Sequence, residues 1–293
     1  MKFRYLTLTF LFCAGFAKAE IVFDYTGSIQ TFTANAAGIY DITAYGGAGG
    51  ADTLRSQPGG AGAEIGVLFS LNAGETLDIV VGQQGGTGED AGGGGGGSFV
   101  YIDSSGSLGT LLLAAGGGGG AGGVASGENA SLTTAGGNGT GSGGASGGTG
   151  GQGGSAFSGC GGAGILSDGG GNTFCTGGSG PPSFAGGSGD NTPVPGIGGS
   201  GGYGGGGGGL NGGGGGGYSG GGGGGAGTSG AGGGGGSYST VTPDVSTFST
   251  FNDGEVVITT LTPEPSYFGP IALLFAGFAG FELRRGRNNR SSS

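Results

Sequence analysis

The chain has 293 residues, of which 92 are glycine and none is histidine, so it lacks the commonest general base and metal ligand. Glycine at this density without a strict Gly-X-Y period excludes collagen. The net charge is −10, and the segment between Glu20 and Thr262 has 16 acidic residues and one cation, Arg55, a net charge of −15 that excludes nucleic acid and anionic lipid as partners, since both need clustered Lys or Arg.

Residues 1–19 have the layout of a cleavable secretory signal. Lys2 and Arg4 precede an apolar stretch at residues 5–16, and small residues stand at Ala17 and Ala19 before Glu20. The alternative, a buried first helix, leaves the A-x-A ending unexplained. We therefore expect an exported protein whose mature chain begins at Glu20.

Short β-like runs alternate with glycine turns in the first part of the mature chain. They are residues 21–25, 29–33, 39–45, 63–71, 76–81, 98–102 and 110–113, and a last run is 255–261. Short strands at this spacing favour an antiparallel sandwich or barrel over parallel βαβ units. Tyr40, Ile42 and Ala44 alternate with polar residues, as one buried strand face requires. The sequence predicts an all-β fold, an antiparallel β-sandwich.

Glycine runs dominate residues 116–236, which permits two interpretations. A floppy linker is one, because ordering six glycines costs roughly 6–12 kcal/mol and a hydrogen bond returns only about 1 kcal/mol. A packed bundle of polyglycine-II strands is the other. Single apolar residues punctuate the runs at regular intervals, namely Tyr203, Leu210, Tyr218 and Tyr238, and strands adjoin both ends. These features favour the packed bundle.

Two cysteines remain after removal of the leader, which contains Cys13. Cys160 and Cys175 are expected to form a disulfide in an oxidising compartment, with two free thiols as the alternative. The closed loop of 15 residues would add about 3 kcal/mol through chain entropy.

Motifs for catalysis and metal binding are weak here. The segments 217–221 and 144–148 fit G-x-S-x-G, but no histidine can activate Ser219 or Ser146. Residues 85–90 fit the start of a calcium-binding repeat, yet only one copy occurs, so Glu89 and Asp90 are not assigned as ligands. We expect no catalytic residue, no metal and no cofactor, and hence no enzyme.

The end of the chain has three parts in order. They are Pro263, Glu264 and Pro265, an apolar stretch at residues 267–281, and an arginine cluster that includes Arg284, Arg285 and Arg287. The apolar stretch covers about 22 Å as a helix, a marginal span for a hydrocarbon layer of ~30 Å.

This order resembles the PEP-CTERM sorting tail of Gram-negative bacteria, although Thr262 stands where valine is commonest. The resemblance implies a single short transmembrane helix in the inner membrane and an exosortase-type processing enzyme as partner. The protein would then reach the cell surface or the polysaccharide matrix. A plain membrane anchor is the alternative.

Residues 77–85, followed by glycines and then by 98–100 and 111–116, resemble the glycine-rich domain of the anaplastic lymphoma kinase and leukocyte tyrosine kinase receptors. Segments 38–46, 212–225 and 254–258 fit too, so the resemblance covers residues 22–260. It implies a β-sandwich joined to polyglycine-II strands, and recognition of protein ligands. No kinase domain follows in this chain.

The sequence thus predicts a signal at residues 1–19, a glycine-rich domain at 20–262 and a sorting tail at 263–293. The predicted function is that of a non-enzymatic surface or matrix protein, with an exopolysaccharide or a protein as possible ligand. A specific protein- or glycan-binding module is the alternative. An ice-binding surface is a third, although the sequence has no regular threonine ladder.

Overall fold

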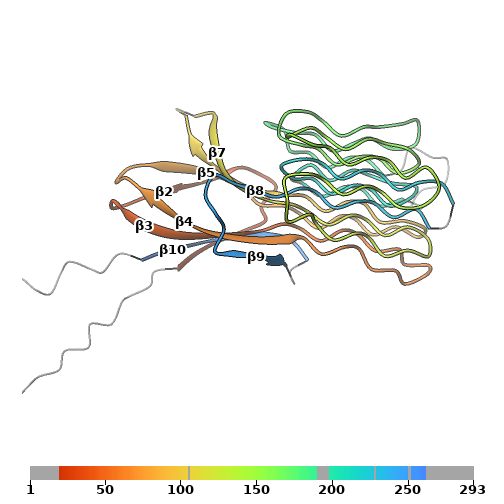
Figure 1. Cartoon of the computed structure of the whole chain (residues 1–293), viewed down its shortest axis with the longest axis horizontal. Helices are drawn as coiled ribbons and strands as arrows, with labels where there is room; N and C mark the ends of the chain where they lie inside the picture. The colour runs from red at the N-terminus through yellow and green to blue at the C-terminus, as the bar shows by residue number, and fades with distance from the viewer. Residues whose placement is uncertain (1–19, 105, 190–197, 228, 250–251, 262–293) are drawn as a thin grey trace, which may run out of the picture. The chain divides into compact units, whose positions relative to one another are not determined.

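The computed structural model describes residues 20–104, 106–189, 198–227, 229–249 and 252–261 (Figure 1). The predicted signal at 1–19 and the predicted sorting tail with its helix at 263–293 lie outside the described residues. The segment 20–260 forms one compact unit. Within it, the regular secondary structure of the described residues is entirely β-strand, which confirms the predicted all-β class.

Sheet A contains the first and the last strand of this unit. Its five antiparallel strands, in spatial order, are β1 (Glu20–Asp24), β10 (Glu255–Thr260), β3 (Gly38–Tyr45), β4 (Ala63–Leu71) and β9 (Val245–Phe248). β10 lies between β1 and β3, with Ile258 opposite both Ile21 and Ile42. Sheet A is therefore complete only when the two ends of the unit have come together.

Sheet B is also antiparallel and has five strands. Their spatial order is β2 (Gln30–Thr33), β5 (Thr76–Val80), β6 (Ser98–Asp103), β7 (Leu108–Ala115) and β8 (Tyr238–Ser239). The register between β6 and β7 shifts next to Tyr101. β2 is an edge strand of this sheet.

The two sheets contribute to one apolar core. Side chains at most 2% exposed come from both, namely Ile42, Ile65, Val67, Val256 and Ile258 from sheet A and Leu77, Ile79, Val100 and Leu113 from sheet B. In β3, Tyr40, Ile42 and Ala44 are buried while the residues between them are partly exposed. The alternation predicted for this strand is confirmed.

Two short strands were not predicted from the sequence. β8 has only two residues, and all four residues of β9 are exposed, so neither has a buried face that periodicity could reveal. Each forms by pairing with the free edge of a longer strand. β8 pairs with β7, and β9 pairs with β4.

The glycine segments lie side by side next to the sheets as extended, mutually hydrogen-bonded strands (Figure 1). Segment 116–121 shows the pattern. Its N–H donors reach the same neighbour at every third residue: Gly117 and Gly120 donate to Gly216 and Gly213, Gly118 and Ala121 to Gly47 and Gly50, and Gly119 to Glu128.

The carbonyl groups of segment 116–121 serve three other neighbours in the same three-residue repeat. They accept at 116 and 119 from Ala63 and Gly60, at 117 and 120 from Gly235 and Gly232, and at 118 and 121 from Gly95 and Gly92. One strand is therefore surrounded by six others. We call the described residues of 46–62, 82–97 and 116–236 the glycine lattice.

The lattice is larger than the sequence indicates. The loops 46–62 and 82–97, which connect strands of the sandwich, were predicted only as turns, yet they supply neighbours of segment 116–121. Run length does not separate the loops from 116–236, because residues 92–97 are themselves six consecutive glycines. Both loops are short and lie between predicted strands, so a turn was the simpler prediction for each of them. The extra segments anchor the lattice directly in β3, β4, β5 and β6.

Candidate functional site

The predicted sorting residues Pro263, Glu264, Pro265, Arg284, Arg285 and Arg287 lie outside the described residues. Among the residues that are described, no helix is long and apolar enough to cross a membrane.

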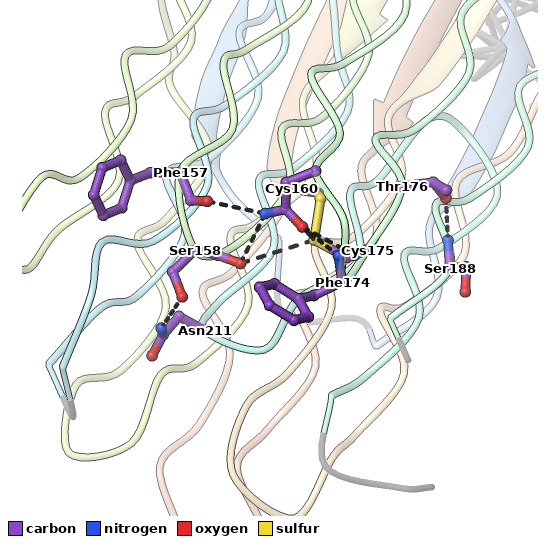
Figure 2. Close-up of a disulfide and its surroundings, with 9 residues drawn as sticks. Phe157, Ser158, Cys160, Phe174, Cys175, Thr176, Ser188 and Asn211 are labelled. Atoms are coloured by element: carbon purple, nitrogen blue, oxygen red, sulfur yellow. Dashed lines mark hydrogen bonds between the residues drawn. A yellow bond between two sulfur atoms is a disulfide. The ribbon is translucent and has the colours of Figure 1, made fainter. Parts of the chain in front are cut away.

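The predicted disulfide is present. Cys160 and Cys175 are joined, with 6.0 Å between their Cα atoms, and both are fully buried (Figure 2). Asn172 fixes the backbone of the turn that leads to Cys175, because its Oδ1 atom accepts a hydrogen bond from the Cys175 N–H at 3.1 Å. Cys160 belongs to the lattice, since its N–H donates to Gly208 and its carbonyl accepts from Gly214. The disulfide thus ties an outer turn to an inner strand.

Arg55 joins two turns of the lattice. Its guanidinium contacts Asp52 at 3.2 Å and Asp90 at 2.8 Å, and these hydrogen bonds, the one to Asp90 first, raise the pKa of Arg55. Asp52 is fully buried, so its charge needs this partner. Asp90, which the sequence placed in a calcium-like repeat, is therefore part of an ion-pair network.

Ser219, which matched a nucleophile pattern, is fully buried, and its hydroxyl oxygen accepts a hydrogen bond from the Gly151 N–H at 3.1 Å. It holds a turn of the lattice. In the described part of the chain, no three of the residue types His, Cys, Asp and Glu gather in a way that could hold a metal ion.

A groove lies over the outer face of sheet B, at the edge formed by β2. It is a hollow of about 690 Å³, lined by Ile29, Thr31, Asp78, Asp103, Gly106, Ser107, Leu108, Pro181 and Pro182. The strands place these residues together because Thr31 pairs with Asp78 and Asp103 with Leu108. Pro181 and Pro182 come from the lattice. The groove is thus mostly apolar, with two carboxylates in its lining.

The two carboxylates have different surroundings. Asp103 is partly exposed and accepts a hydrogen bond from the Gly106 N–H at 2.9 Å. Asp78 is only 7% exposed, and no hydrogen bond or ion pair joins its carboxylate to another described residue. Burial, and then the charge of Asp103, raise the pKa of Asp78. No residue that the structure describes therefore compensates its charge.

An aromatic cluster covers the same face of sheet B beside the groove. Val80, Phe99, Tyr101, Leu111 and Ala114 of the sheet pack with Phe184 of the lattice, and Tyr203, Tyr218 and Tyr238 adjoin them. The punctuating tyrosines of the sequence thus face the sandwich, whereas Leu210 lines a separate hollow of about 230 Å³ near Arg55.

Tyr101 stands directly opposite Asp78 on the neighbouring strand. Its hydroxyl is buried without a hydrogen-bond partner among the described residues, and burial raises the pKa of Tyr101. Asp78 was not predicted as a site residue. The sequence did carry a signal for it, because Asp78 is an acidic residue within the apolar run at residues 77–81. The turn at Pro181, which also lines the groove, carried no such signal in the sequence.

Comparison of the chain with protein-family models and with curated proteins gives no match.

Asp78→Asn is expected to raise the free energy of unfolding at pH 7 by about 1 kcal/mol, since it removes a largely desolvated charge that is repelled by Asp103 and has no partner among the described residues. Because the folded-state pKa of Asp78 is raised, the folded protein keeps this proton to higher pH than the unfolded chain. Stability therefore falls as pH rises from about 4 through the raised value.

Urea unfolding between pH 4 and pH 8 measures both effects, and Asp78→Asn should flatten the pH dependence. Asp244→Asn is the matched control, because Asp244 is exposed and lies before β9 on the other sheet. A variant at Asp78 that is less stable than the parent at pH 7 would contradict the assignment.

Proposed function

We propose that this protein is a non-enzymatic, exported protein of the bacterial surface or of the exopolysaccharide matrix. The observation that carries the proposal is the glycine lattice, in which six backbone neighbours surround one strand. Its three-residue hydrogen-bond repeat is that of polyglycine-II strands. Such a lattice uses backbone groups for cohesion and leaves its turns free to vary, which suits a displayed scaffold.

The two ends of the sequence and the disulfide support export. A basic-apolar-small leader precedes Glu20, and the Pro-Glu-Pro motif, apolar stretch and arginine cluster follow Thr262. A disulfide between Cys160 and Cys175 persists in an oxidising compartment. In this proposal the tail holds the chain in the inner membrane until an exosortase-type enzyme cuts near Pro263.

Replacement of Pro263, Glu264 and Pro265 by alanine tests the sorting step. The parent chain is expected to appear as a shortened form on the surface or in the matrix. The variant should remain membrane-held at full length, because the processing enzyme no longer recognises it.

Cell fractionation and mass measurement of the C-terminus distinguish the two forms. Replacement of Ser291, Ser292 and Ser293 by alanine is the control, since these residues follow the arginines and should not affect processing. Unchanged release of the Pro-Glu-Pro variant would overturn the sorting proposal.

A second candidate function is a specific binding module, which the receptor resemblance of residues 22–260 also implies. The groove on sheet B favours it, because it combines an apolar lining with Asp78, a residue only 7% exposed whose carboxylate has no partner among the described residues. Apolar clefts with a few placed polar groups are the usual form of a ligand site.

A further inference from the structure

The groove on sheet B lacks a positive charge of its own. Between Glu20 and Thr262 the only cation is Arg55, and its guanidinium is engaged by Asp52 and Asp90. Asp103 shares the groove and adds a second negative charge. A cationic group from outside is therefore the electrostatic complement of this site.

The remaining lining defines what must accompany the cation. Ile29, Leu108, Pro181 and Pro182 surround the carboxylates with apolar surface. A lysine or arginine side chain matches this arrangement, since its aliphatic stem can lie on apolar surface while its charged end reaches a carboxylate. A small hydrated metal ion would leave that apolar surface uncovered.

The edge strand β2 indicates a polypeptide as the source of the cation. β2 pairs with β5 alone among the described strands, so its other edge has unpaired N–H and C=O groups. A segment added beside β2 would lie roughly 10 Å from β5, because neighbouring strands are about 4.8 Å apart. A long basic side chain could cross Thr31 over this distance and approach Asp78.

We propose that the groove binds a lysine or arginine side chain presented by an extended segment of a partner polypeptide, with the charged group against Asp78 and Asp103. This inference rests on the second candidate function, that of a binding module, and is independent of surface sorting. A second copy of the mature domain cannot supply the side chain, since Arg55 is its single cation and is already paired.

Fluorescence anisotropy with a labelled peptide tests the proposal on the full-length protein in detergent. The probe is the acetylated peptide Thr-Val-Lys-Val-Thr, and the comparison peptide carries glutamine in place of lysine. The lysine peptide is expected to bind saturably and at least about tenfold more tightly than the glutamine peptide, and less tightly as salt increases.

Asp78→Asn should weaken binding of the lysine peptide at least about tenfold, whereas Asp244→Asn, which removes the same charge far from the groove in the fold, should leave it unchanged. Equal binding of the two peptides, or equal binding by the parent and Asp78→Asn, would overturn the site. Butylamine that competes as well as the peptide would overturn the polypeptide assignment. None of these results depends on sorting, which the fractionation experiment tests separately.

Discussion

Gly118→Ala is expected to lower the free energy of unfolding by about 3 kcal/mol or more. A Cβ atom at Gly118 would overlap the carbonyl group of Gly60, whose oxygen belongs to a hydrogen-bonded neighbour. The Gly118 N–H donates to Gly47 and its carbonyl accepts from Gly95, so the strand cannot shift without breaking bonds on other sides. The strain is therefore transmitted to several strands at once.

Thermal unfolding measures this effect, and a loss of about 3 kcal/mol corresponds to a Tm lower by roughly 6–12 °C for a unit of this size. Gly137→Ala is the matched control, because a Cβ atom there would come no closer than 3.3 Å to any neighbour and the strand is partly exposed. If both variants lost equal stability, glycine propensity rather than lattice packing would explain the loss.

Residues with a buried periodicity were the predictable part of the fold. In β3, alternation of Tyr40, Ile42 and Ala44 with polar residues indicated both the strand and its inner face. β9 was unpredictable for the opposite reason, since every one of its residues is exposed. Sequence patterns report burial, and a strand held by backbone pairing alone leaves little trace in them.

The lattice shows a related limit. Glycine has no side chain whose polarity or size could indicate what lies next to it. The six neighbouring strands of segment 116–121 therefore cannot be assigned from composition. The inclusion of loops 46–62 and 82–97 follows from three-dimensional packing. In contrast, the pairing of Cys160 with Cys175 was predictable because these are the two cysteines that follow the predicted signal at residues 1–19.

The groove was the least predictable feature. Asp78 stands out in its strand, but Thr31 and Asp103 come from other strands, and Pro181 comes from a lattice turn more than a hundred residues away. These residues lie too far apart in the sequence for strand periodicity or a short motif to connect them. Only the strand order of sheet B and the path of the lattice bring them together.

Replacement of both cysteines by serine is expected to lower the free energy of unfolding by about 3 kcal/mol, because the unfolded chain regains the entropy of a 15-residue loop. Denaturant unfolding with and without a reductant measures it. The reductant should destabilise the parent and leave the double variant unaffected. Ser188→Ala is the control, since Ser188 is exposed on a nearby strand (Figure 2).

Hydrogen exchange of individual amides shows which strands lose stability in the double variant. The Gly214 N–H donates to the Cys160 carbonyl, so Gly214 should exchange faster in the double variant if the disulfide holds this inner strand in place. Amides of the sandwich core, such as that of Ile42, should change only as much as global stability does. Faster exchange confined to the turn at Asn172 would instead mean that the disulfide stabilises that turn alone.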